Sequence, residues 1–321
     1  MWRQPFRRWQ YAKRYKINFP LARCSCLQPR TVLERPRLGR KPSHPVGKSV
    51  TTENNFAVGG ARTGTDNELN PLFSPLGVTL PGLQQQIDSF KAKNSKADGD
   101  ALYILWAGAN DYLNEQLNLA DPVVAQTTIN TAVSNLGNAI THLAKIGAKN
   151  FLIPNLADLG KLPQTNKNPI VAGGLGLITQ SHNDALSQLL KSLPLLNPDS
   201  GLNLMSLDVF SLVNQAIADP NSGFTNTTDA CLNVPLPFFT GNCSNPDQYL
   251  FWDNLHPTAR EHQKISDLAY SVLHSKVPPG KSVPEGSAAL GVLVVGVWLG
   301  AKSLRRQKLS KRRSPVPVAV D

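Results

Sequence analysis

Acidic residues are scarce at both ends of this chain. Residues 1–50 contain 13 Lys/Arg and one acid, Glu34, and residues 301–321 contain seven Lys/Arg and one acid, Asp321. Residues 51–300 hold 13 Lys/Arg against 20 Asp/Glu, so the net charge of +11 comes from the ends and the body is acidic. A nucleic-acid-binding protein carries positive charge and base-stacking aromatic side chains on its folded surface. The distribution therefore argues against nucleic acid as a partner.

The chain has only four cysteines, Cys24, Cys26, Cys231 and Cys243. Cys24 and Cys26 have no partners at the spacing of a metal site, so we assign them no role. The other two flank a loop rich in Asn, Thr, Pro and Gly, which has little apolar content to hold it. We favour a disulfide between them, which fits an oxidising compartment, with two free thiols as the alternative.

The apolar run at the C-terminal end, Ser287–Ala301, is shorter than the ~20 residues that a membrane span usually needs. It follows the sequence VPEG and precedes a basic cluster. This tail resembles a PEP-CTERM sorting signal, with Gly286 where that motif has Pro, and a plain membrane anchor is the alternative. Both interpretations predict an exported protein of the cell envelope or exterior, in contact with a membrane or a sorting machinery through residues 287–301. No N-terminal signal peptide is visible.

Short apolar runs alternate with helical patterns through the body of the chain. The predicted strands are residues 101–108, 150–154 and 202–207, the predicted helices are 123–146, 171–193 and 258–274, and residues 218–248 read as a long, turn-rich loop. Strands that alternate with helices predict an α/β fold with a parallel sheet covered by helices on both faces. In such sheets the functional residues follow the carboxyl ends of the strands.

Two short blocks suggest groups that could stabilise developing negative charge. Residues 55–64 read NFAVGGARTG, in which paired glycines let backbone N–H groups approach a ligand closely. Residues 106–113 read WAGANDYL and follow a predicted strand, so the Asn110 amide could donate to an oxyanion. Each block has a simple turn as its alternative.

A third block, FWDNLHPTAREH at residues 251–262, contains Asp253 and His256. Their three-residue spacing can bring a carboxylate to the imidazole Nδ1–H, which leaves Nε2 free as a general base. Pro257 and Thr258 begin the following helix and would hold His256 on a rigid turn. A structural Asp with a surface His is the alternative, and His262 reads as a residue of the helix face.

In order and separation, these three blocks resemble the SGNH/GDSL hydrolase family, in particular bacterial lecithinase/haemolysin-like lipases and esterases, over about residues 51–275. The resemblance implies a three-layer α/β/α, flavodoxin-like fold and the hydrolysis of a small-molecule or lipid carboxylic ester without metal or cofactor. It implies that Gly60 and Asn110 form an oxyanion hole, with Gly59 a weaker candidate. It also implies that Asp253 and His256 belong to a Ser-His-Asp triad.

The family's first block, GDSLSDxGN, supplies the nucleophilic serine and is absent from this chain. A His–Asp pair without a nucleophile cannot form an acyl-enzyme, so we expect this chain to have no nucleophile and little activity. A shifted reading frame accounts for the absence. With permitted codons, Trp2–Gln10 and the first base of Tyr11, read one base later, encode GDSLSDAGN. In the same frame Thr31–Gly47 can encode RFSNGPVWVENLATQLG, which resembles the family's GRxSNGxxWxxxLA segment.

We therefore interpret residues 1 to about 47 as an out-of-frame translation, with the frame restored between roughly Val46 and Asn55. An authentic arm, either a transit peptide or a polybasic membrane patch, is the alternative. A broken gene and an error in the recorded sequence both produce this pattern. A non-catalytic surface or binding protein on the same scaffold is the alternative function.

The predicted organisation has three parts. Residues 1–50 form a miscoded or disordered basic segment, and residues 51–276 form the SGNH hydrolase domain, whose first strand is lost. Residues 277–321 form a linker, a short apolar helix and a basic tail.

Overall fold

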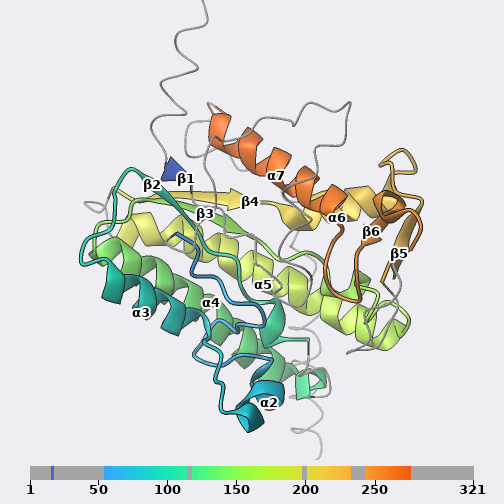
Figure 1. Ribbon diagram of the computed structural model, residues 1–321, viewed down its shortest axis with the longest axis horizontal. Helices are drawn as coiled ribbons and strands as arrows, with labels where there is room; N and C mark the ends of the chain where they lie inside the picture. The colour runs from blue at the N-terminus through green and yellow to red at the C-terminus, as the bar shows by residue number, and fades with distance from the viewer. Residues whose placement is uncertain (1–15, 18–53, 114–117, 197–200, 233–242, 276–321) are drawn as a thin grey trace, which may run out of the picture. The chain divides into compact units, whose positions relative to one another are not determined.

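The computed structural model describes residues 16–17, 54–113, 118–196, 201–232 and 243–275 (Figure 1). The chain divides into two compact units, residues 1–273 and 274–321, and nearly all the described residues belong to the first. Within the described ranges, no helix is both long enough and apolar enough to cross a membrane. The predicted segment 287–301 and the predicted boundaries near residues 50 and 276 lie outside these ranges, so they stay predictions.

The centre of the fold is a four-stranded parallel sheet with the order β1-β2-β3-β4. Its strands are β1 (Lys16–Ile17), β2 (Ala101–Ile104), β3 (Asn150–Pro154) and β4 (Asn203–Leu207). The three strands predicted from apolar runs are confirmed, but β2 ends at Ile104 rather than at Gly108. Directly after β2, the Leu105 N–H donates to the carbonyl of Leu152 in β3 over 3.2 Å, and the chain then leaves the sheet.

The predicted loss of the first strand concerns mainly residues outside the described ranges. In the described chain, the edge beside β2 is occupied by β1, with Lys16 opposite Ala101 and Ile17 opposite Leu102. Strands usually contain five or six residues. β1 therefore pairs with only the first half of β2.

Alternate residues of the strands pack into different layers of helices. Phe151 and Ile153 lie in a core cluster with residues of α3 (Leu83–Lys93), α4 (Pro122–Lys145) and α5 (Pro169–Leu196). Leu152 lies in a cluster that includes Ile265 and Ala269 of α7 (Ala259–His274). Figure 1 shows α3, α4 and α5 along one face of the sheet and α7 along the other. The chain therefore has the predicted three-layer α/β/α fold.

The three long helices predicted from periodicity are α4, α5 and α7, each within a few residues of its predicted bounds. α4 begins where Asp121 accepts a 2.8 Å hydrogen bond from the Val123 N–H, and its first residue, Pro122, lacks an N–H that would need a partner. The remaining helices, which the sequence did not reveal, are α2 (Asn70–Phe73), α3 and α6 (Val209–Ala218). Short 3-10 helices occupy residues 74–76, 109–111, 118–120, 159–161 and 246–248.

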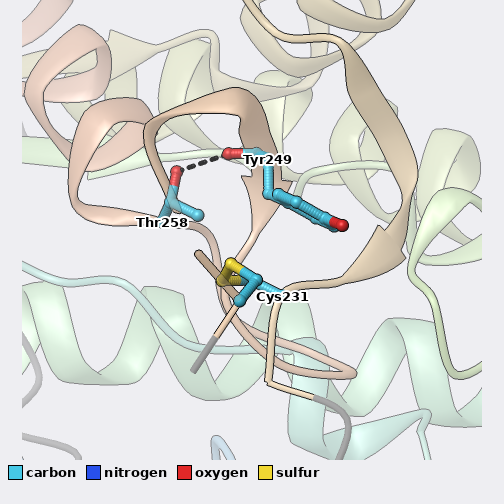
Figure 2. The surroundings of a disulfide bond; sticks show 4 residues. Cys231, Tyr249 and Thr258 are labelled. Carbon is cyan, nitrogen blue, oxygen red and sulfur yellow. Dashed lines mark hydrogen bonds between the residues drawn. A yellow bond between two sulfur atoms is a disulfide. The ribbon is translucent and has the colours of Figure 1, made fainter. Parts of the chain in front are cut away.

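The segment predicted as one long loop, residues 218–248, contains a strand, and this corrects the prediction. β5 (Asn226–Ala230) reads NTTDA and pairs in parallel with β6 (Tyr249–Phe251). β5 was missed because it has no apolar run, and pairing alone marks it as a strand. The Cys231–Cys243 disulfide predicted from the sequence is present directly after it, and Figure 2 shows it beside β6, where Thr258 Oγ1 donates to the Tyr249 carbonyl over 2.8 Å.

Candidate active site

Asp253 and His256 make the contact that their spacing predicts. His256 Nδ1 lies 2.8 Å from Asp253 Oδ2 and 3.0 Å from Oδ1. The backbone N–H groups of Leu255 and His256 also donate to Asp253 Oδ1, over 2.8 and 2.7 Å. The His256 side chain is 51% exposed, and its Nε2 makes no hydrogen bond to any described residue. The imidazole is thus oriented from one side and open on the other.

The turn that carries this pair is fixed by backbone contacts on both sides. The Trp252 N–H donates to the His256 carbonyl over 2.7 Å, and Phe251 forms an antiparallel bridge with Pro257. The Thr258 N–H donates to the Leu250 carbonyl over 2.9 Å. α7 starts directly afterwards, so His256 sits between a strand and a helix, as the Pro257–Thr258 pair predicts.

The electrostatics of the pair favour a charged carboxylate beside a basic imidazole. Burial acts to raise the pKa of Asp253, but hydrogen bonds from the His256 side chain and from backbone N–H groups outweigh burial, and the pKa falls below its usual value. The same hydrogen bond raises the pKa of His256, against the opposing effect of burial. A higher pKa strengthens His256 as a base.

The predicted oxyanion residues lie close to one another. Asn110 Nδ2 donates to the Ala61 carbonyl over 3.1 Å, which places the amide beside the Gly59–Gly60 pair. A primary amide has two N–H donors, so the second stays available to a ligand. Gly60 has φ of +76°, and a Cβ there would come within 2.6 Å of Asn67 Oδ1, so this tight turn requires glycine. The Gly60 carbonyl accepts from the Glu68 N–H, whereas its own N–H donates to no described residue.

Asp111 joins the two blocks, a role that the sequence did not reveal. Its carboxylate accepts from the Thr63 N–H over 3.0 Å and from Thr63 Oγ1 over 2.7 Å. Burial raises the pKa of Asp111, and the hydrogen bonds from Thr63 offset only part of this effect. The sequence signal for this contact was a pair of polar residues, Thr63 in block 55–64 and Asp111 in block 106–113. The Thr63 hydroxyl and N–H can donate to the Asp111 carboxylate.

A buried pair beneath the Gly108–Asp111 turn was also missed. The Tyr112 hydroxyl lies 2.7 Å from His182 Nδ1, the two rings meet edge to face, and both residues are fully buried. Burial raises the pKa of Tyr112 and lowers that of His182 to about 4, so both side chains are uncharged at neutral pH and share one hydrogen bond. His182 Nε2 is buried without a hydrogen-bond partner among the described residues and faces Gly108, where an added Cβ would lie 3.3 Å from it.

Both parts of the site follow strands, β2 of the central sheet and β6 of the two-stranded sheet. The Gly108–Asp111 turn follows β2. The Asp253–His256 turn contacts the loop between β3 and α5, where the Gln164 N–H donates to the Asn254 carbonyl over 3.1 Å. In the described part of the chain, no group of three His, Cys, Asp or Glu side chains could hold a metal ion. The expectation that the chain carries no nucleophile rests on the absence of a GDSL block from the sequence, and it stays a prediction.

Comparisons with known proteins point to one family. The model of the GDSL-like Lipase/Acylhydrolase family matches residues 32–269. The phosphatidylcholine-sterol acyltransferase of Aeromonas hydrophila is 26% identical over 264 residues, which cover 69% of this chain and 74% of that protein. The thermolabile hemolysin of Vibrio parahaemolyticus is 26% identical over 237 residues, which cover 66% and 49%.

An uncharacterized protein from the trpE-trpG intergenic region of Pseudomonas putida is 27% identical over 249 residues, which cover 72% of this chain and 39% of that protein. A GDSL esterase/lipase of Arabidopsis thaliana is 25% identical over 187 residues, which cover 54% and 51%. The chain thus spans about half, or less, of the length of several of these relatives.

Proposed function

Because the chain belongs to the GDSL-like lipase/acylhydrolase family, we propose that its body is the scaffold of an enzyme that hydrolyses small-molecule or lipid carboxylic esters through an acyl-serine intermediate. The observation that carries this proposal is the Asp253–His256 pair. The carboxylate fixes Nδ1, raises the pKa of the imidazole and leaves Nε2 open toward a substrate. This is the arrangement that a general base needs.

The proposed reaction uses the described residues in three roles. His256 Nε2 removes the proton from a serine hydroxyl as its oxygen attacks the ester carbonyl, and Asp253 stabilises the resulting imidazolium. The oxyanion forms beside the free N–H of Asn110 and the N–H of Gly60. His256 then returns its proton to the departing alcohol, and a water molecule, activated in the same way, releases the acid from the serine.

This chain lacks the GDSL block, which supplies the nucleophilic serine in the family. We propose that it is encoded by the codons of Trp2–Tyr11 in the shifted frame, as GDSLSDAGN, and that the first strand lies upstream in that frame. The family match starts at residue 32, after this block. The match also includes residues 32–47, which the proposal places out of frame. The codons of this segment must therefore be read directly.

The test compares this chain with the protein made from the same gene in the shifted frame over the first 47 codons, including the upstream strand. We expect the shifted-frame protein to hydrolyse p-nitrophenyl butyrate and to be labelled by a fluorophosphonate. This chain should be unlabelled and slower by about 10⁶-fold, the loss seen when a serine hydrolase is deprived of its nucleophile. His256→Gln in the shifted-frame protein is the matched control for the base. An unlabelled, inactive but folded shifted-frame protein would contradict the proposal.

The absence of a GDSL block favours one second candidate, a non-catalytic binding protein on the same scaffold. In that case the codons of residues 1–47 would encode no hidden block, and an authentic arm would be required. The reading of those codons separates the two candidates.

We further propose that the protein is exported and held at the cell envelope through residues 287–301, as a PEP-CTERM-like sorting tail or an anchor. The Cys231–Cys243 disulfide supports an oxidising location. Cell fractionation with and without residues 277–321 tests this proposal. Retention of the truncated protein in the envelope would contradict it.

A further inference from the structure

A small pocket lies between the 3-10 turn after β3, residues 159–161, and the N-terminal part of α5. Its volume is about 240 Å³, which suits a ligand smaller than a drug-sized molecule. Its lining is rich in polar and very small residues, which include Asp158, Lys161, Gln180, Gly160, Gly173 and Gly176. The glycines leave room that larger side chains would fill.

The most buried polar group of this pocket is the Asp158 carboxylate, since that residue is only 8% exposed. Its Oδ1 accepts a 2.9 Å hydrogen bond from the Gly160 N–H, and no described residue donates to Oδ2. A Cβ on Gly176 would lie 3.5 Å from Oδ1 and 4.0 Å from Oδ2, so the carboxylate faces the glycine side of α5. Among the described residues, none forms an ion pair with Asp158. Buried charges in native proteins are normally paired, so a cationic ligand fits this position.

The residues of the pocket favour an organic ammonium group as that cation. A divalent metal ion takes roughly six oxygen ligands, and the described chain contains no group of three His, Cys, Asp or Glu side chains that could hold one. Quaternary ammonium groups are bound by aromatic side chains, and none of the lining residues is aromatic. A primary ammonium group has N–H donors that can form a charge-assisted hydrogen bond to Asp158 Oδ2.

Lys161 adds a positive charge to the wall of the same pocket. Its side chain is exposed and forms no ion pair with a described residue. It would repel a ligand that carries only a positive charge, but it would attract the anionic group of a ligand that carries both charges. The pocket therefore matches a small zwitterion, whose ammonium contacts Asp158 and whose phosphate or carboxylate contacts Lys161.

The pocket follows the carboxyl end of β3, the side of a parallel sheet on which ligands usually bind. The loop after its 3-10 turn folds back onto it, because Thr165 Oγ1 donates to the Leu159 carbonyl. The preceding residue, Gln164, donates its N–H to the Asn254 carbonyl in the turn that carries His256. One loop, between β3 and α5, therefore contacts both the pocket wall and the candidate active site.

We propose that this pocket binds a small zwitterion with a primary ammonium group, through Asp158 and Lys161. The inference is independent of the proposed ester hydrolysis, because neither a nucleophile nor His256 lines the pocket. Gly173 supports it. Glycine is the least favourable residue in a helix interior after proline, and an added Cβ at Gly173 would have nothing within 4 Å. Packing within the described fold thus does not require glycine there, whereas a ligand in the pocket does.

The test is an NMR titration of the present full-length chain with phosphoethanolamine, which follows the backbone amides of Gly160, Gly173 and Gly176. We expect saturable shifts with a millimolar dissociation constant, because so small a ligand makes few contacts. β-Alanine, which has a carboxylate in place of the phosphate, should bind as well, and the tighter of the two ligands identifies the anionic group. Phosphocholine has no N–H donor and should bind at least about tenfold more weakly.

Two variants test the assigned residues. Asp158→Asn keeps an acceptor for the Gly160 N–H but removes the charge, so the affinity for phosphoethanolamine should fall at least about tenfold. Gly173→Val places a side chain in the open space beside the pocket and should also weaken binding. Gly174→Val is the matched control, because Gly174 also has nothing within 4 Å of an added Cβ but does not line the pocket.

The absence of saturable shifts with both zwitterions would overturn the inference. Equal affinities for phosphoethanolamine and phosphocholine would overturn it too, because the N–H donors would then contribute nothing. The same holds for an unchanged affinity in either folded variant, Asp158→Asn or Gly173→Val. None of these outcomes bears on ester hydrolysis, so a failure of this inference is distinguishable from a failure of the proposed function.

Discussion

His256 owes its basicity to one neighbour, Asp253, and to a turn whose backbone amides hold that carboxylate in place. We expect NMR titration to give His256 a pKa above the ordinary value of about 6.5. Asp253→Asn should lower that pKa, because burial would then act without the carboxylate. Asp88→Asn, on the exposed face of α3, is the control. An unchanged His256 pKa in the Asp253 variant would contradict the assignment.

The same shift has a small consequence for stability. Since the folded-state pKa of His256 is raised, the pair stabilises the fold below about pH 6.5 and loses that contribution as pH rises through the folded-state pKa. Half of the His256 side chain is exposed, so solvent screening keeps the contribution below about 1 kcal/mol.

His182 should produce the opposite pH dependence. Its folded-state pKa is lowered to about 4, so its stabilising contribution is complete above about pH 6.5 and is lost as pH falls from there toward 4. The full effect is about 3 kcal/mol. Urea unfolding at pH 4.5 and 7.0 should show a weaker pH dependence for His182→Phe than for the parent chain. Tyr112→Phe leaves the imidazole buried and should keep the dependence, and identical dependence in all three proteins would refute this role.

Gly108 lies in the turn between β2 and the candidate oxyanion residue Asn110. Its φ is +132°, and an added Cβ would lie 3.1 Å from His182 Cε1 and 3.3 Å from Leu156 Cδ2. Gly108→Ala should therefore destabilise the chain by about 2–4 kcal/mol through backbone strain and crowding together. Gly77→Ala is the control, since Gly77 has φ of +74° but nothing within 4 Å of an added Cβ. The free energy of unfolding of both variants is measured by urea unfolding. Equal decreases in the two variants would show that His182 does not restrict this turn.

The Cys231–Cys243 disulfide lies directly after β5, beside the β5–β6 pair. The two cysteines are 12 residues apart, and a loop of that length gives about 3 kcal/mol of stabilisation in the chain-entropy account. Substituting both cysteines by serine should lower the unfolding free energy by roughly that amount. The parent chain with reducing agent should match the double variant. A parent chain insensitive to reduction would show that packing alone holds β5.

The sequence predicted the parts of the fold that periodicity specifies. Buried strands such as Asn150–Pro154 and long amphipathic helices such as α4 were recognisable because one layer or face of each is apolar. β5 was not recognisable, because Asn226–Ala230 is polar and is a strand only through its pairing with β6. In the site, Asp253 and His256 were recognisable because they are local in sequence. The Thr63–Asp111 and Tyr112–His182 contacts were not, because their partners are 48 and 70 residues apart.

At the scale of the whole molecule, we expect the edge beside β2 to have the largest loss of buried surface. β1 pairs with only two residues of β2, and a restored first strand would bury additional surface there. The shifted-frame protein should therefore unfold at higher urea concentration and with a larger m value than this chain, since m scales with the surface exposed on unfolding. Equal m values for the two proteins would indicate that the present N-terminal residues already bury a comparable surface.

The central claim is that the missing nucleophile block lies in the neighbouring reading frame of the same gene. Sequencing the gene across its first fifty-five codons and upstream of Met1 tests it most directly. We expect the codons of Trp2–Tyr11, read one base later, to give GDSLSDAGN, and those of Thr31–Gly47 to give the SNG-containing segment in the same frame. Codons that encode neither block would contradict the account, and the basic N-terminus would then be an authentic arm of a protein without a catalytic serine.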